Sequence, residues 1–141
     1  MRPLGWIVTL SFVVALSPAL GGAPKARVIV VNRATVIAFF PPVTETELSN
    51  DPDTNEALAD FQYYAARVRQ QLHEAGVDFE ELYASSFGIK CGAKTTTFRS
   101  KNVKVGYYFV APGKSPHIEY GVMTDSDILS VAKEYFRLAS K

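Results

Sequence analysis

The globular part of the chain opens with two short apolar runs. They cover residues 28–31 (VIVV) and 35–40 (TVIAFF) and are rich in β-branched and aromatic residues. Runs without regular polar alternation are typical of strands that are covered on both faces. Pro41 and Pro42 end the second run, because proline has no N–H to donate to a sheet. The polar residues 43–53 are expected to form a loop.

A helix is predicted next, over residues 55–75. Apolar residues recur there at spacings of three and four, which places them in one stripe along the helix. Asp53 and Glu56 resemble a capping box at its start. Gly76 can end the helix, because glycine adopts the positive φ that many helix ends require. The stripe consists of Leu58, Phe61, Ala65, Val68, Leu72 and Ala75.

The second half of the chain predicts further strands and a terminal helix. Residues 77–84 are expected to form a strand, whose alternation separates Asp78 and Glu80 from Glu81. We interpret these acids as a solvated strand end. A capping pattern at residues 124–127 precedes apolar residues at helical spacing. Further β-favouring segments lie at residues 95–99, 103–110 and 117–122.

The elements therefore run strand, helix, strand, hairpin and helix. A strand, helix and strand joined by a right-handed crossover form a parallel pair, and a hairpin adds antiparallel strands. We predict an α/β fold, a three-layer sandwich with a mixed central sheet of four to five strands flanked by helices.

The N-terminus has the anatomy of a secretory signal over residues 1–21. Arg2 precedes an apolar core, Pro18 breaks it, and small residues allow cleavage before Gly22. An uncleaved anchor is the alternative, because residues 3–24 carry no charge and could just cross a bilayer of ~30 Å. The short apolar core favours cleavage.

We therefore expect a secreted or periplasmic protein without stable membrane insertion after cleavage. Residues 22–27 would form a short leader and residues 28–141 one domain. Composition agrees with this, since 48% apolar and 21% charged residues are typical of a globular domain. Without Arg2 the acids and bases balance, so global attraction to nucleic acid is not supported, and no nucleic-acid partner is expected.

Charge is nevertheless unevenly distributed. Residues 45–81 hold ten acids and two bases, whereas residues 90–114 hold six bases and no acid. Those bases are Lys90, Lys94, Arg99, Lys101, Lys104 and Lys114. With Phe98, Tyr107 and Tyr108 interleaved, they could bind an anionic polymer or an acidic partner.

We favour a structural role for the basic segment. Its lysines would protect an edge strand from aggregation. Its aromatic residues would pack in the core, with Val103, Val105, Tyr107 and Phe109 on the inward face of one strand.

Cys91 is the single cysteine of the chain and the main candidate for chemistry. Lys90 and Lys94 flank it, and nearby cations favour the reactive thiolate. The alternative, which we favour, is a buried and inert cysteine that fills a small gap. His73 and His117 have no partners at metal-ligand spacing, so neither a metal nor another cofactor is expected. Serine-hydrolase and phosphate-binding motifs are absent from the sequence.

The element order resembles the thioredoxin fold. The final third resembles it best, through strand 105–110, the Pro-Gly-Lys turn, the return strand, Gly121 and the capped helix. Residues 35–40 resemble the central strand that leads to the family's active-site loop. Residues 87–90 resemble the turn ahead of the family's cis-proline, whose position falls near Ala93.

The resemblance implies a working surface formed by the loop 41–53 and the segment 87–104. It also implies that Cys91 lies beside that surface. The sequence departs from the family because residues 41–53 contain no cysteine, and one sulfur cannot perform intramolecular dithiol exchange. We therefore predict a thioredoxin-like binding or accessory module for an unknown protein or small ligand. Its expected binding residues are Pro41, Pro42, Lys90, Lys94, Arg99, Lys101 and Lys104.

Two other functions stay open. The first is a single-thiol redox protein or thiol carrier that uses Cys91 as its catalytic residue. The second is an envelope protein that pairs through an exposed strand edge, for which a homodimer is one form.

Overall fold

A computed structural model describes residues 27–139 of the chain. The predicted signal peptide (1–21) and most of the predicted leader lie outside the described residues. None of the described helices is long and apolar enough to span a bilayer. The elements are β1 (Val28–Val31), β2 (Thr35–Phe40), α1 (Glu45–Asn50), α2 (Pro52–Glu74), β3 (Asp78–Tyr83), β4 (Ser86–Cys91), β5 (Lys94–Arg99), the 3₁₀ turn η1 (Lys101–Val103), β6 (Gly106–Val110), β7 (His117–Tyr120) and α3 (Asp125–Phe136).

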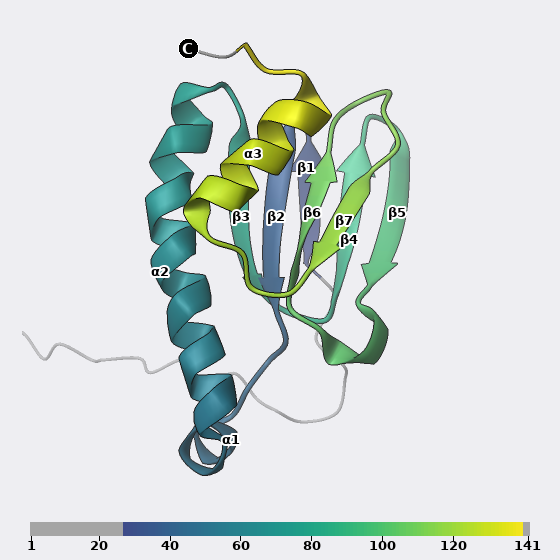
Figure 1. Cartoon of the computed structure of the whole chain (residues 1–141). Coiled ribbons are helices and arrows are strands. Elements are labelled where there is room, and N and C mark those ends of the chain that lie inside the picture. Colours follow the sequence, from purple (N-terminus) through teal and green to yellow (C-terminus); the bar gives the residue numbers. More distant parts are fainter. Residues whose placement is uncertain (1–26, 140–141) are drawn as a thin grey trace, which may run out of the picture.

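The strands form two mixed sheets rather than one (Figure 1). The larger sheet has the order β3-β2-β6-β7, in which β2 pairs in parallel with β3 and antiparallel with β6. The smaller sheet has the order β1-β4-β5, in which β1 pairs in parallel with β4. The predicted α/β class and the four-stranded mixed sheet are thus confirmed.

The prediction that helices flank the sheet is correct for one face only. Helices α2 and α3 cover one face of the four-stranded sheet, and the three-stranded sheet covers the other (Figure 1). Two cores result, a first one between the helices and the four-stranded sheet and a second one between the two sheets. Strand β2 is buried throughout because its side chains alternate between these two cores. Val36, Ala38 and Phe40 contact the helices, whereas Ile37 and Phe39 contact the second sheet. An uninterrupted apolar run predicts cover on both faces but does not show what provides it.

The second core is largely aromatic. The rings of Phe87 and Phe98 both lie within 6 Å of Phe39, with centroid separations of 5.7 and 5.1 Å. Tyr108 meets Phe98 at 5.1 Å. Phe98, Tyr107 and Tyr108 are all buried, so they offer no stacking platforms for a polymer. The prediction that these aromatic residues pack in the core is confirmed.

The segment predicted as the loop 43–53 contains the short helix α1. Thr44 and Glu47 form its capping box, each side chain bonding the other residue's backbone N–H. Asp51 caps α2, with Pro52 in its first turn, so the predicted capping box at Asp53 was placed two residues late. Proline suits that position because the first helical N–H has no partner within the helix.

Two further predictions in the second half were wrong. The resemblance places a turn at residues 87–90, but these residues lie within β4, and Gly92 and Ala93 form the tight turn to β5. Gly92 has a φ of 64°, which a two-residue hairpin requires and glycine tolerates. Val103 does not lie on an inward strand face, because β6 begins only at Gly106 and Val103 is 60% exposed.

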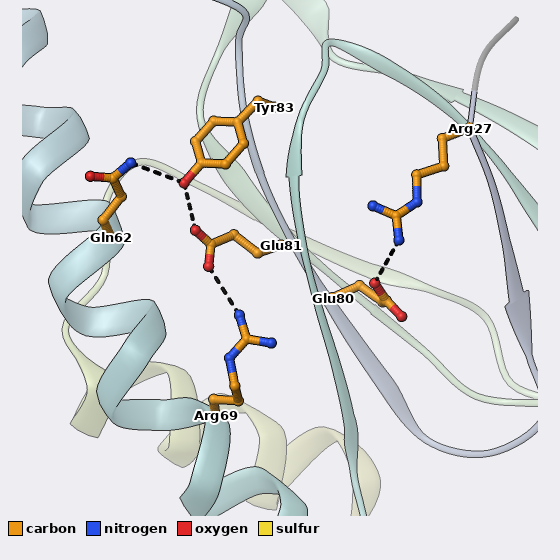
Figure 2. Close-up of polar contacts among 6 residues, drawn as sticks. All are labelled: Arg27, Gln62, Arg69, Glu80, Glu81 and Tyr83. Atoms are coloured by element: carbon orange, nitrogen blue, oxygen red, sulfur yellow. Dashed lines mark hydrogen bonds and ion pairs between the residues drawn. The ribbon is translucent and has the colours of Figure 1, made fainter. Parts of the chain in front are cut away.

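The three acids of β3 are bound to arginines on both sides of the sheet. Figure 2 shows Glu81 accepting from Arg69 of α2 at 3.1 Å, while Glu80 turns the other way and accepts from Arg27 at 3.2 Å. Asp78 accepts from Arg33 at 2.9 Å. The predicted alternation is confirmed: the acids stay partly exposed to solvent, and each also pairs with an arginine.

Candidate functional site

A cavity of about 950 Å³ lies at the carboxyl end of β2. Three separate parts of the chain form it: the segment from β2 into α2, the residues around η1, and the end of β7. Its apolar lining consists of Phe40, Pro41, Pro42, Val43, Ala57, Val103, Val105, Tyr120 and Gly121. Its polar lining consists of Thr46, Glu47, Asn50, Asp51, Asp53, Thr54 and Lys104. A pocket of this size is at the upper end of those that hold small ligands.

The first wall follows from local sequence. Phe40 ends β2 and packs against Phe61 of α2, with ring centroids 5.3 Å apart. Pro41 and Pro42 then stop the strand, and the chain turns into α1. Because proline cannot pair with a neighbouring strand, this wall presents flat apolar rings without a backbone edge.

The opposite wall contains strained backbone. Asn102 and Val103 have φ values of 56° and 51° in η1, and Val103 lines the cavity. The left-handed region is unfavourable for a β-branched residue, so this geometry has to be imposed by the surrounding structure. Ser100 provides part of that constraint, since its hydroxyl donates to the Lys104 carbonyl and accepts from the Lys104 N–H. The exposed side chain of Val103 is therefore held at the mouth of the cavity.

Charges lie at the rim of the cavity. Asp51 accepts from the Thr54 hydroxyl at 2.6 Å and from its N–H at 3.2 Å, and these hydrogen bonds hold the pKa of Asp51 below its usual value of 3.8. It stays ionised at neutral pH. On the other side, the Lys104 ammonium lies 5.9 Å from the centre of the Tyr120 ring. Most of the exposed lining of the cavity is apolar.

The structure brings together only some of the predicted binding residues. Pro41, Pro42 and Lys104 line the cavity. Lys101 begins η1 and Arg99 ends β5, at the same end of the molecule as α1 (Figure 1). Lys90 is exposed on β4, and Lys94 follows the β4–β5 turn at the opposite end (Figure 1). The segment 87–104 therefore spans the length of the second sheet and does not form one surface with the loop 41–53.

Cys91 lies with Lys94 at that opposite end. Its side chain is partly buried and packs against the core between the sheets. It lines a second cavity of about 520 Å³, together with Lys94, Lys114 and Tyr108. That cavity shares no lining residue with the one at the end of β2. The expectation that Cys91 adjoins the 41–53 loop does not match this arrangement.

Metal ligands do not converge in the part of the chain that the structure describes. No group of three His, Cys, Asp or Glu residues there could hold a metal ion. His117 instead contacts Glu119 at 2.8 Å and stacks on Tyr135. His73 lies in the last turn of α2, as the sequence predicts.

Sequence reasoning missed Val103 and Tyr120 as site residues. Val103 reads as an ordinary strand residue, because its positive φ is visible only in three dimensions. Tyr120 is an aromatic residue at a strand end beside a glycine, a weak signal that turns and binding sites share. Comparisons with protein-family models, curated proteins and solved structures gave no match for the chain.

Proposed function

We propose that this chain is an exported thioredoxin-like domain that acts as a binding module and not as a dithiol oxidoreductase. The cavity at the end of β2 is its binding site, and an extended apolar segment of a partner polypeptide is its ligand. The cavity itself is the observation that carries this proposal, since it is large, apolar and formed by three separate parts of the chain.

The placement of the cavity supports the link to the thioredoxin fold. The four-stranded sheet keeps the parallel pair, hairpin and terminal helix on which the resemblance rests. The cavity adjoins the segment that follows the central strand, which is where the resemblance places the working loop. Pro41 and Pro42 occupy that segment, and the chain's one sulfur is elsewhere, so dithiol exchange has no second sulfur.

The character of the lining supports an apolar ligand. Tyr120 and Val103 are 41% and 60% exposed, although both are large apolar residues. Exposed apolar residues that gather around a concavity are typical of a binding surface. The strained η1 turn supports the same interpretation, because strain of this kind is concentrated at functional sites.

The alternative function, a single-thiol protein using Cys91, remains a separate proposal with its own site. The partly exposed thiol in the second cavity, near two lysines, is the observation that favours it. The two functions are separable by one variant. Cys91→Ser removes every thiol reaction of the chain but leaves the β2 cavity unchanged.

The test of the binding proposal is to fill the cavity. Ala57 lies on α2 and faces the cavity, so Ala57→Trp places an indole in the space that a ligand would occupy. The probe is a fluorescein-labelled peptide of alternating leucine and proline, whose binding to the full chain is followed by anisotropy. We expect Ala57→Trp to weaken binding by about tenfold or more, equivalent to about 1.4 kcal/mol.

Ala59→Trp is the matched control, because Ala59 is exposed on the same helix and does not line the cavity. It should bind the peptide as the unmodified chain does. Equal binding by the Ala57→Trp chain, or no peptide binding by the unmodified chain, would refute the proposed site. Loss of binding in Cys91→Ser would instead place the peptide in the second cavity, which Cys91 lines.

A further inference from the structure

The three-stranded sheet has two outer strands, β1 and β5, and no described element covers the face that carries Val28 and Val30. Strand β1 pairs with β4 only, and no other described strand lies along it. Its outward side chains, Val28 and Val30, are 51% and 59% exposed. An exposed apolar edge strand is a template for pairing with another chain, and it is usually blocked by charge, proline or a bulge. β1 has none of these.

The backbone of β1 offers free hydrogen-bonding groups at this edge. The Arg27 carbonyl accepts from the Gly88 N–H of β4 at 2.8 Å. Successive residues of a strand direct their backbone groups to alternate sides, so Val28 and Val30 direct theirs away from β4. No described residue forms a hydrogen bond with these groups. The same two residues therefore present both free backbone groups and exposed apolar side chains.

The uncovered face is cationic. Lys90 and Arg99 lie on this face, because Arg99 pairs with Ser86, which shares a face of β4 with Lys90. Lys94, in contrast, pairs with Cys91 and lies on the opposite face. The three strands contain no acidic residue. Lys90 stands beside Val30 in the register of β1 and β4, so it lies on the same face as the exposed valines. The acids of the chain are concentrated between residues 45 and 81, in α1, α2 and β3. The face thus combines an apolar edge with positive charge.

We propose that an acidic, extended segment of a partner protein adds to β1 as a fourth strand of this sheet. Its backbone would pair with Val28 and Val30, its apolar side chains would cover theirs, and its carboxylates would reach Lys90. Main-chain pairing supplies affinity in this mode of recognition, and side chains at alternate positions supply specificity.

A second copy of the chain fits this surface less well. A four-residue strand is only about 13 Å long, so edge pairing alone buries far less than a stable dimer needs. A second copy that also covered the face would place the Lys90 and Arg99 side chains of both copies against one another. Like charges in an interface oppose association. An acidic partner meets the same residues with the opposite charge.

The test uses the full chain and a fluorescein-labelled nonapeptide that repeats Val-Val-Glu-Glu. This repeat puts valine and glutamate on both faces of an extended strand. We expect saturable binding that weakens as salt rises, and no binding when lysine replaces the glutamates. Val30→Pro should abolish binding, since it removes the edge N–H without breaking a bond to β4. Lys90→Glu should weaken binding about fivefold.

Control variants and probes distinguish an acidic partner strand from a second copy of the chain and from a polyanion. Lys133→Glu makes the same charge change on α3 and should bind the peptide normally. Circular dichroism checks that Val30→Pro is folded; if it is not, Val30→Asp repels the acidic strand and keeps the N–H. Unchanged binding in both Val30 and Lys90 variants would overturn the proposal. A concentration-dependent dimer that Val30→Pro abolishes would overturn it in favour of a second copy. Binding of heparin and not of the peptide would indicate a polyanion site.

Discussion

Gly106 is the position at which one added methyl group should cause the largest damage. It lies in β6 between Phe39 of β2 and Tyr120 of β7. A Cβ there would lie 2.5 Å from the Glu119 carbonyl oxygen and 2.9 Å from the Phe39 ring. Ordinary contacts between carbon and oxygen are about 3.3 Å or longer. The backbone of β7 would therefore have to move by about 0.8 Å to accommodate alanine.

That movement breaks hydrogen bonds between β6 and β7, so relaxation is costly. Overpacking of this kind costs about 3 kcal/mol. For a domain of this size, Gly106→Ala should lower the melting temperature by about 12 °C. Because Tyr120 and Gly121 at the end of β7 line the β2 cavity, the same variant should also weaken binding of the leucine-proline peptide.

Gly88→Ala is the matched control, on β4 of the other sheet. A Cβ at Gly88 would approach only the tip of the Val28 side chain, at 3.0 Å. That side chain is half exposed and can rotate away. Alanine also restricts the unfolded chain, which stabilises a folded protein by about 0.4–1 kcal/mol. Gly88→Ala should therefore melt within about 4 °C of the unmodified chain. Equal melting temperatures of the two variants in thermal unfolding would contradict a costly clash at Gly106.

Two further predictions follow from ionisation and exposure. The hydrogen bond from Arg33 holds the pKa of Asp78 below its usual value of 3.8, so the stability from this pair is complete above that pH and is lost as the pH falls through the lowered pKa. Below about pH 4, the free energy of unfolding measured with urea should fall less steeply with pH in Asp78→Asn than in the unmodified chain. An unchanged pH dependence would contradict this. Cys91 is partly buried, so a thiol reagent should label it several times more slowly in the native chain than in urea. Equal rates would show a fully open thiol.

Local patterns in the sequence were enough to find most elements. The stripe from Leu58 to Leu72 follows the period of a helix, and the structure places Phe61, Ala65, Val68 and Leu72 in the core. Thr124 caps α3 through the Asp127 N–H, as its spacing predicts. These predictions succeed because a helix and its cap depend on residues within a few positions of one another.

Local sequence patterns identified only some residues of the candidate site. Pro41 and Pro42 could be recognised as the end of a strand, and they do line the cavity. The sequence could not show that Lys90 and Lys94 lie far from Lys104. In the structure, Lys90 on β4 and Lys94 on β5 lie at the opposite end of the molecule from η1 and Lys104. A charge run shows only that its residues are neighbours along the chain. Their positions in space depend on the hairpin between them.

The sequence by itself determined the α/β class, the long amphipathic helix, the terminal helix and the buried central strand. Only the tertiary structure decided that β1 leaves the central sheet and pairs with β4, 60 residues further along in register. It also decided that a second sheet, and not a helix, covers Ile37 and Phe39. The reason is physical: burial of an apolar face is favourable against any apolar partner. The choice of partner is made by long-range packing, which no local pattern encodes.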